Sequence, residues 1–490
     1  MNISIIGAGI GGLSIACLLA SKGHSVTVFE KNQTVGGKMN TVKSDGFIFD
    51  TGPSLLTMPY ILEKLFNQCG VKLSDYLNLL PLSPICRYHY QDGNTFNCFD
   101  DRLKTQEEIN KIAPEDSEAY SRFLDYSESL YLKTSDAFIH NPLYDLSDFK
   151  NLDLFSFFRI DAFSNVSNRI DSYFKSPYLR KFFKRFTTYN GSSPYLAPAT
   201  LNVIPHVELN QGGFYVDGGM YKIAEALFDL GNSLGVTFNF GSMINEIQVH
   251  NSKVSALVSN GAVYQADLII ANSDSTETLV NLLSERVFSP KKKEAAKNIE
   301  PSCSGFVLLL GIDRVYEELA HHTIFFSKDY EHEFKQIFNQ KVMPDDPTIY
   351  VANTSFSNPE HAPENGSNLF ILVNAPYLST NYNWDENKQL YGRFVIQELE
   401  KRGLKNLSKH IQFKDLITPS DFYTKYLSNK GSIYGTSSNN KFSAFIRPRN
   451  KSKEIDGLYF VGGSTHPGGG IPLVVQSAFN AAELIQRYES

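Results

Sequence analysis

The sequence predicts an α/β protein with a parallel sheet of the Rossmann type, and three features of its N-terminal segment indicate this fold. An apolar run at residues 3–6 leads directly into a glycine-rich segment at 7–12. A helix-patterned segment then extends to about Lys22, and a second β-branched run follows at 25–29. Glu30 comes directly after that run. Strand, glycines, helix, strand and acid in this order are typical of a dinucleotide-binding βαβ unit.

The glycines of this segment occupy the positions that the chemistry requires. Gly7 permits a tight turn, Gly9 lets the backbone approach a pyrophosphate, and Gly12 lets the helix pack close to the strand. The helix N-terminus presents free N–H groups and a positive dipole end to the phosphates. Glu30 is expected to accept hydrogen bonds from a ribose. The predicted cofactor-binding residues here are Gly7, Ala8, Gly9, Ile10, Gly11, Gly12 and Glu30.

The uncharged stretch before Lys22 also resembles a signal peptide or a membrane span. No basic segment precedes it, however, and glycines interrupt its apolar run, so both alternatives are disfavoured. Because the first predicted strand begins at residue 2, no leader is expected before it, and the sequence predicts a mature cytoplasmic chain.

The residues after Glu30 separate FAD from NAD. A Gly-Gly-basic loop ends at Lys38, and a short strand-like run at 47–50 leads into the turn at 51–54. Such a loop resembles the second FAD contact of amine-oxidase-like flavoproteins, many of which carry Arg where this chain has Lys38. Lys offers a point charge where Arg offers a fork, so a looser contact is expected. FAD contacts are predicted for Lys31, Gly37, Lys38, Gly52, Pro53 and Ser54.

A second match to a flavin site lies almost at the C-terminus. A strand-like run at 457–461 precedes a glycine-rich turn, and an apolar helix pattern begins at about Leu473. Backbone donors and a helix dipole there would stabilise negative charge on a reduced flavin ring. The alternative for Gly468–Gly470 is a plain loop, which the N-terminal fingerprint disfavours. The predicted contacts are Gly462, Gly463, Gly470, Ile471 and Pro472.

Binding elements at both ends predict a discontinuous FAD-binding domain made of residues 1–75, 205–284 and 441–490. Its middle piece contains Gly218-Gly219, a helix pattern and a β-meander. Ile244 begins one meander strand and either lends backbone groups to adenine or is a core residue. Residues 76–204 and 285–440 are predicted to form an α+β substrate domain with a helical, membrane-facing region.

Bulk properties exclude several classes of function. The chain has 490 residues, a net charge of −6 and no dense basic stripe, so no nucleic-acid partner is expected. Its five cysteines are scattered without metal-ligand spacing, which predicts reduced thiols and no metal. His321-His322 lacks the spacing and the acid partner of a metal site.

The segment Tyr173–Phe186 interleaves aromatic and basic residues and has two interpretations. It either lies in a membrane interface, with rings among headgroups and cations on anionic lipid, or is an ordinary amphipathic helix that packs its Phe face inward.

With both glycine segments and Gly52-Pro53-Ser54 in view, the chain resembles the bacterial FAD-dependent carotenoid desaturase and oxygenase family (phytoene desaturase-like flavoproteins) over essentially its whole length. Within that family it is most similar to terminal oxygenases of C30 diapocarotenoids. The finer resemblance comes from residues outside the cofactor motifs, at 54–66, 319–322, 342–350 and 431–435. The FAD segments and the turn at 465–468 are shared with sister desaturases and do not separate the two activities.

The resemblance implies FAD-dependent oxidation of a terminal methyl group of a C30 diapocarotenoid to an aldehyde, with O2 involved; the alternative is a desaturase. The substrate is almost pure hydrocarbon, and leaving lipid for water would cost it on the order of 20 kcal/mol. We therefore expect an apolar tunnel and a peripheral association with the cell membrane, from which the polyene is taken. This expectation favours the membrane interpretation of the aromatic-basic segment more than its pattern alone does.

A polyene has no group to protonate, so positioning and the exclusion of water are the expected tasks of the protein. Candidate polar residues near the ring are His466, His206, Glu208 and Gln211. For His206 and Glu208 the alternative is packing or surface polarity, and His466 is the better placed because its turn should border the flavin. Two other functions stay open, an amine oxidase of the same fold and a flavin-binding polyene carrier without turnover.

Overall fold

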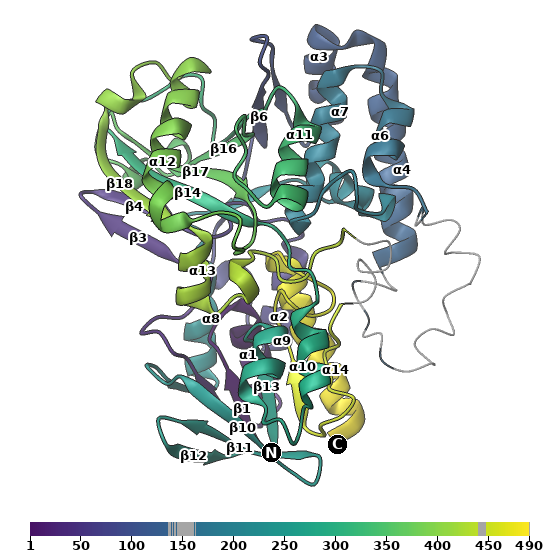
Figure 1. The fold of residues 1–490 in the computed structure, drawn as a ribbon, viewed down its shortest axis with the longest axis vertical. Coiled ribbons are helices and arrows are strands. Elements are labelled where there is room, and N and C mark those ends of the chain that lie inside the picture. Colours follow the sequence, from purple (N-terminus) through teal and green to yellow (C-terminus); the bar gives the residue numbers. More distant parts are fainter. Residues whose placement is uncertain are drawn as a thin grey trace.

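The computed structural model describes residues 1–489 except 136–138, 140, 142–143, 145–160, 162 and 440–446. A five-stranded parallel sheet and both termini lie in the lower part of Figure 1. A seven-stranded mixed sheet and a group of helices form the upper part. The two sheets take their strands from alternating stretches of the chain, so the connections run repeatedly between the two parts.

The parallel sheet has the strand order β19-β13-β1-β2-β9, and all its pairings are parallel. The predicted βαβ unit is therefore present, with β1 at the centre of the sheet. β-branched residues dominate β1 and β2, as expected for strands covered on both faces. The strands are β1 (Asn2–Ile6), β2 (Ser25–Phe29), β9 (Thr237–Asn239), β13 (Leu268–Ala271) and β19 (Leu458–Phe460).

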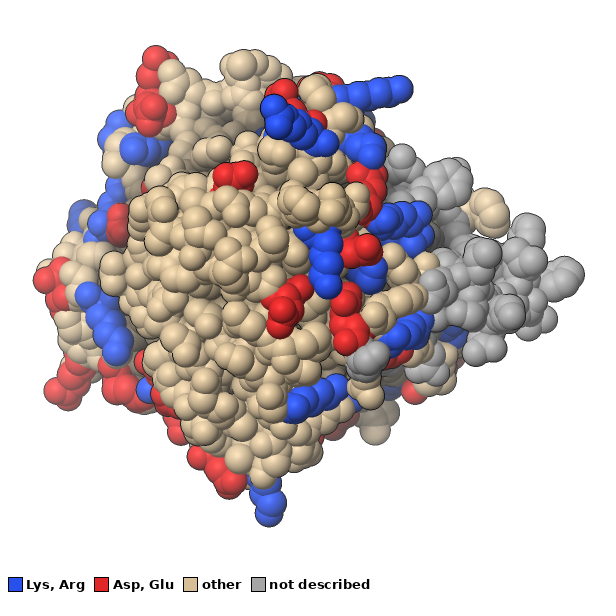
Figure 2. Space-filling view, turned by 90° about the horizontal axis from the view of Figure 1, so that it is seen from below, with Lys and Arg blue, Asp and Glu red and all other residues tan. Residues whose placement is uncertain are grey.

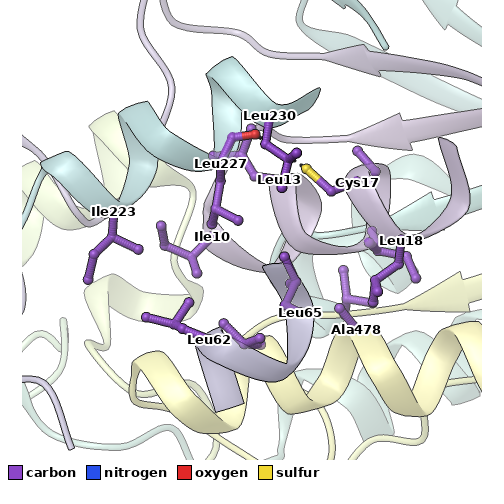
Figure 3. Close-up of a cluster of buried hydrophobic side chains, with 14 of the residues drawn as sticks. Ile10, Leu13, Cys17, Leu18, Leu62, Leu65, Ile223, Leu227, Leu230 and Ala478 are labelled. Carbon is purple, nitrogen blue, oxygen red and sulfur yellow. Dashed lines mark hydrogen bonds between the residues drawn. The ribbon is translucent and has the colours of Figure 1, made fainter. Parts of the chain in front are cut away.

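Four helices pack against one face of this sheet and against one another (Figure 3). Ile3 and Ile5 of β1 point into this cluster, because alternate residues of a strand share a face. The Cys17 thiol at the centre donates to the Leu227 carbonyl at 3.3 Å, so it is a buried packing group. The helices are α1 (Ile10–Ala20), α2 (Tyr60–Gln68), α8 (Lys222–Ser233) and α14 (Ile471–Glu489).

A three-stranded antiparallel meander covers the opposite face of the parallel sheet. Ile6 and Phe29 point toward it and share a core cluster with Ile244 and Leu257. Its strands are β10 (Ile244–His250), β11 (Lys253–Ser259) and β12 (Ala262–Gln265). The predicted meander thus completes the lower part of the molecule.

The upper sheet has the order β18-β14-β17-β16-β15-β6-β7. Helix α12 (Trp384–Lys401) shares a core with one face of β14, where Phe306 and Leu308 lie. Val307 and Leu309 point to the other face and join a second cluster. The strands are β6 (Cys86–His89), β7 (Thr95–Cys98), β14 (Ser304–Ile312), β15 (His322–Phe325), β16 (Ile349–Asn353), β17 (Ser367–Ala375) and β18 (Ile411–Ile417).

A helical region lies beside the upper sheet, and its core answers one question left open by the sequence. Phe174, Phe182, Phe183 and Phe186 are all buried, at no more than 2% exposure. Phe174 stacks on Phe183, and Phe182 packs edge-to-face on Phe183, on Phe186 and on Tyr88 of β6. The Phe face of the segment Tyr173–Phe186 therefore packs inward and does not meet a bilayer. The helices are α3 (Arg102–Ile112), α4 (Ser117–Ser135), α6 (Val166–Tyr173) and α7 (Pro177–Lys184).

Short elements join the two parts, and Asp50 at the end of β4 is their main polar junction. Its carboxylate accepts hydrogen bonds from the Tyr215 hydroxyl (2.6 Å) and from the backbone N–H groups of Met220 (3.0 Å) and Tyr221 (3.3 Å). The short elements are β3 (Thr41–Ser44), β4 (Phe47–Asp50), β5 (Leu79–Pro81), β8 (Phe214–Val216), α9 (Ser275–Glu277), α10 (Pro290–Lys297), α11 (Tyr330–Lys335) and α13 (Pro419–Tyr426).

The lower face mixes Lys and Arg with Asp and Glu around a broad area without charged side chains (Figure 2). The absence of a nucleic-acid partner stays a prediction. In the described part of the chain, every helix is too short or too polar to cross a bilayer.

Candidate functional site

A cavity of about 710 Å³ extends from the parallel sheet up to the seven-stranded sheet. Its size lies within the range of small-molecule and cofactor sites. The lower wall comes from the glycine turn after β1, the end of β2, residues 36–39 and 51–55, the residues after β13, and residues 462–464 and 469–472. Strands β6, β15, β16 and β17 contribute to the upper wall. One hollow therefore joins both predicted cofactor segments to the second sheet.

The glycine turn after β1 forms one end of this cavity. Gly7 has φ +94°, a conformation that side chains rarely adopt. Gly9 is the N-cap of α1 and brings no side chain to the helix end, so the first N–H groups of α1 are left for a ligand. A Cβ on Gly12 would lie 2.1 Å from the Gly7 carbonyl oxygen, which explains why this position is a glycine. Gly7, Gly9, Ile10 and Gly11 line the cavity, and Ala8 and Gly12 do not.

Glu30 is held in place by backbone donors at the end of β2. Its Oε2 accepts from the Ala8 N–H at 2.8 Å, and its Oε1 accepts from the N–H and the side-chain amide of Asn32, both at 2.9 Å. The carboxylate is buried and lines the cavity next to the glycine turn. A fixed acceptor in this position suits a ribose diol.

The basic side chains after Glu30 bond to the opposite wall. The Lys31 ammonium donates to the Thr424 carbonyl at 2.7 Å. The Lys38 ammonium donates to the carbonyls of Ser432 (3.0 Å) and Ile433 (2.8 Å). Burial lowers the pKa of Lys38 to about 8, against the opposing charge of Asp274. Gly37 and both lysines line the cavity, so the site contains two cations.

The turn Gly52-Pro53-Ser54 connects the cofactor side of the cavity to the upper sheet. The Ser54 hydroxyl is hydrogen-bonded to the Tyr350 hydroxyl of β16. The Ser54 carbonyl lies 3.2 Å from Nε2 of His322, and the Ile85 carbonyl lies 3.1 Å from its Nδ1. Burial lowers the pKa of His322 to about 4, so the ring is neutral near pH 7. This turn is thereby tied to β15 and β16.

The C-terminal turn closes the cavity next to the N-terminal one. Gly462, Gly463, Gly470, Ile471 and Pro472 all line it. The Gly462 N–H donates to the Ser477 hydroxyl of α14 at 2.8 Å, which fixes the turn on its helix. A Cβ on Gly11 would lie 3.0 Å from the Gly462 nitrogen, so the two ends of the chain touch here.

Asn272, which follows β13, lies between these two turns and was not predicted. Its amide donates to the Gly7 carbonyl at 3.2 Å, and its Oδ1 lies 2.6 Å from a Cβ placed on Gly11. Ile244 is both buried in the core and part of the cavity wall. Its position is therefore compatible with a contact to adenine and with a packing role.

The lower wall therefore fits an FAD. It offers free helix N–H groups, a fixed ribose acceptor, two cations and glycines at positions where a Cβ would crowd Asn272 or a neighbouring backbone. Bound here, the dinucleotide would place phosphate at the α1 N-terminus.

The candidate polar residues lie in different places. Among the described residues, His466 and His206 are not part of the cavity wall. Nε2 of His466 lies 3.2 Å from the Asn141 carbonyl, and burial lowers its pKa to about 4. His206 stacks on Tyr131, and its ring nitrogens contact the amides of Asn210 and Gln211. Catalytic roles for the two histidines stay predictions.

Glu208 does line the cavity, and it does so as half of an unpredicted ion pair. Nη2 of Arg185 lies 2.6 Å from its Oε1, and the Tyr189 hydroxyl donates to its Oε2. All three residues line the cavity. From the basic-aromatic composition of residues 173–186, Arg185 was expected only as a cation at the surface. Its burial depends on a partner 23 residues away.

The rest of the upper wall is rich in apolar and aromatic side chains. These residues come from five separate stretches of sequence outside the cofactor motifs. They are Ile85, Ile324, Tyr330, Tyr350, Phe370, Leu372, Ile433 and Tyr434. Tyr350, Ile433 and Tyr434 belong to segments that carried the finer resemblance. His321 and His322 are buried against Tyr215 and Tyr350, and within the described residues no cluster suited to a metal ion is found.

Comparisons with known proteins agree with this geometry. Residues 10–486 match the family described as flavin containing amine oxidoreductase. The chain is 37% identical to the 4,4'-diapolycopene oxygenase of Methylomonas sp, over 97% of this chain and 96% of that protein. It is 36% identical to the 4,4'-diaponeurosporene oxygenase of Staphylococcus haemolyticus, over 100% of this chain and 97% of that protein.

Solved structures show the same fold at low sequence identity. An oxidoreductase from Methanosarcina mazei superposes with a TM-score of 0.67 at 17% identity, covering 99% of this chain and all of that one. Cyclohexylamine oxidase from Brevibacterium oxydans gives 0.62 at 16% identity, covering 100% of this chain and 99% of that one.

Proposed function

Because the chain belongs to the flavin-containing amine oxidoreductase family, we propose that it oxidises the terminal methyl group of a C30 diapocarotenoid to an aldehyde. FAD is its cofactor and would accept electrons when bound. Because oxidation of a methyl group to an aldehyde removes four electrons and adds one oxygen atom, O2 is the co-reactant, and the second product is water. The observation that carries the proposal is full-length identity of 35–37% to proteins named diapolycopene and diaponeurosporene oxygenases. The matched regions cover 97–100% of the chain and so are not confined to the cofactor motifs.

The cavity supports a polyene substrate. Its upper wall is made mostly of apolar and aromatic side chains, and it is continuous with the flavin-binding wall. Burying a hydrocarbon chain there recovers about 0.8 kcal/mol per carbon. The chain's own task is then to hold one polyene end against the cofactor, to exclude water and to keep the turn at 52–54 fixed through Ser54, Tyr350 and His322.

Product analysis tests this function directly. The FAD-loaded protein is mixed with liposomes that contain 4,4'-diaponeurosporene, and the extracted pigments are examined by mass spectrometry. We expect a gain of oxygen at one polyene end. A loss of hydrogen alone would make the protein a desaturase, and unchanged pigment would reject both activities.

We also propose that the protein acts at the membrane surface, as a peripheral protein. The substrate stays in lipid, since transfer of the polyene to water would cost on the order of 20 kcal/mol. Leu132, at the end of α4, is 68% exposed, and Phe163, in the same helical region, is 66% exposed. Large exposed apolar side chains of this kind insert into the interface between headgroups and acyl chains.

Co-sedimentation with anionic liposomes tests the membrane contact. Leu132→Glu should lower the bound fraction, because a carboxylate is repelled by anionic lipid. Val315→Glu is the matched control, since Val315 is similarly exposed (59%) in the loop that follows β14. Equal binding of both variants would contradict a contact through α4.

A further inference from the structure

The ion pair between Arg185 and Glu208 is an unusual wall for a hydrocarbon cavity. Both side chains are buried, at 7% and 1% exposure, and both line the hollow. Burying two charges costs several kcal/mol per ion, and apolar residues of similar size often replace such pairs without loss of stability. Stability alone therefore does not account for this pair, and a polar role in the cavity does.

The guanidinium has donors to spare. Nη2 donates to Oε1 of Glu208, and the Tyr189 hydroxyl takes the other carboxylate oxygen. Nε of Arg185 is buried and has no hydrogen-bond partner among the described residues. Buried donors without an acceptor are costly, so a ligand that carries an acceptor atom would be stabilised here.

Aromatic rings hold the guanidinium in position. Its Cζ lies 4.2 Å from the ring centroid of Phe186, 5.2 Å from that of Tyr88 and 5.6 Å from that of Tyr189. Cation–π contacts of this kind restrict the plane and the reach of the group. The donor is therefore preorganised, and little conformational entropy is lost when a ligand binds.

The pair lies on the side of the cavity where the turn at 52–54 meets the upper sheet. The Arg185 guanidinium lies 5.2 Å from the ring centroid of Tyr88 in β6, and β6 pairs with β15, the strand of His322. Nε2 of His322 lies 3.2 Å from the Ser54 carbonyl. Cys86 of β6, in the same wall, is subject to the charges of both Arg185 and Glu208. A polyene end held near this turn therefore comes within the neighbourhood of the cation.

We propose that Arg185 binds the oxygen atom of a polyene end that has already been oxidised. Glu208 and Tyr189 act as positioning residues that orient the guanidinium. The substrate class of the site then includes polyenes with a terminal alcohol or aldehyde, in addition to the hydrocarbon. This inference rests on the proposed function, because it assigns a place to the oxygen that the reaction introduces.

The test compares binding of two ligands without turnover. A C30 polyene with methyl ends and the same polyene with one aldehyde end are titrated from liposomes, under anaerobic conditions, and bound polyene is followed by its absorption. The affinity ratio of aldehyde to hydrocarbon is measured for the wild type and for Arg185→Lys. Dividing one ratio by the other removes the difference in lipid partitioning of the two ligands.

We expect this double ratio to be about tenfold, the usual effect of a hydrogen bond to a charged donor. Lys keeps the charge and the pairing with Glu208 but lacks the second donor of the fork. A double ratio below about twofold would overturn the proposal. Arg402→Lys is the matched control: Arg402 is also buried, ion-paired to Asp346 at 2.8 Å and left with an unpartnered Nε, but it is not part of the cavity wall.

Two further measurements keep the test decisive if Arg185→Lys does not fold. The double variant R185M/E208Q removes both charges together and should abolish the preference for the aldehyde. In the wild-type protein, the carbonyl stretch of the bound aldehyde should move to lower frequency in resonance Raman spectra, as a strong donor requires. An unshifted stretch would refute the contact. All of these results are independent of whether the protein oxygenates the hydrocarbon.

Discussion

Replacing Gly11 with Ala probes the point where the two ends of the chain meet around the cofactor site. The added Cβ would lie 2.6 Å from Oδ1 of Asn272, 3.0 Å from the nitrogen of Gly462 and 3.1 Å from its Cα. The first contact requires a shift, and the other two involve backbone that Ser477 holds in place. Overpacking of this kind costs about 1–3 kcal/mol.

Part of this cost is offset, because Ala is favoured over Gly in a helix by about 1 kcal/mol. The net loss is then up to about 2 kcal/mol. If the whole of this net loss weakens FAD binding, the dissociation constant of FAD rises by as much as roughly 30-fold. The assay is a fluorescence titration of the apoprotein with FAD, run beside a measurement of thermal unfolding.

Gly392→Ala is the matched control, since Gly392 also lies inside a helix, α12, away from the cavity. Its Cβ would meet only side chains, at 3.3 Å from Cδ2 of Leu308, 3.4 Å from Cδ2 of Leu416 and 3.7 Å from Cζ of Phe306, and no backbone atom. We expect FAD affinity to be unchanged in this variant. Wild-type FAD affinity in Gly11→Ala would refute the proposed meeting of the two turns.

A double-mutant cycle locates the strain. Asn272→Ala removes the oxygen at 2.6 Å but leaves the backbone of Gly462 in place. The double variant G11A/N272A should therefore recover part of the affinity lost in Gly11→Ala, relative to Asn272→Ala alone. Strictly additive effects would show that Asn272 does not carry the clash.

Three further outcomes follow from named contacts. Glu30→Gln turns an amide toward the Ala8 N–H and should weaken FAD binding by about 10- to 100-fold in the same titration; unaltered affinity would exclude Glu30 as the ribose acceptor. Asp50→Ala leaves the Tyr215 hydroxyl and the backbone N–H groups of Met220 and Tyr221 unpaired and should lower the urea-unfolding free energy by about 3 kcal/mol, whereas a loss below about 1 kcal/mol would argue against this junction. Since the pKa of His322 is about 4 in the folded protein, below its ordinary 6.5, the unfolded chain binds more protons between these values and stability falls as pH is lowered from 6.5 to 4. His322→Gln should reduce that fall by about 1.4 kcal/mol per pH unit, measured by urea unfolding at pH 7 and pH 5, and an unchanged pH dependence would contradict the shift.

The central α/β architecture was predictable because its signals are local. Gly7 has a positive φ that its tight turn requires, and Glu30 follows directly from the strand before it. The apolar alternation of β1 sets which face each residue buries. Such patterns depend on neighbours within a few residues, so the sequence alone determined the βαβ unit and the cofactor class.

Only the tertiary structure decided how the cavity wall is composed. Ser54 and Tyr350 are 296 residues apart, and neither carries a signal for the other. Arg185 reads as a surface cation in its amphipathic segment, yet packing of the Phe face draws it inside to Glu208. His466 belongs to the glycine-rich turn but contacts Asn141 and not the cavity. The direction and the partner of a side chain depend on how elements distant in sequence pack together. Hydrophobic periodicity and motif spacing are local, so they do not predict that packing.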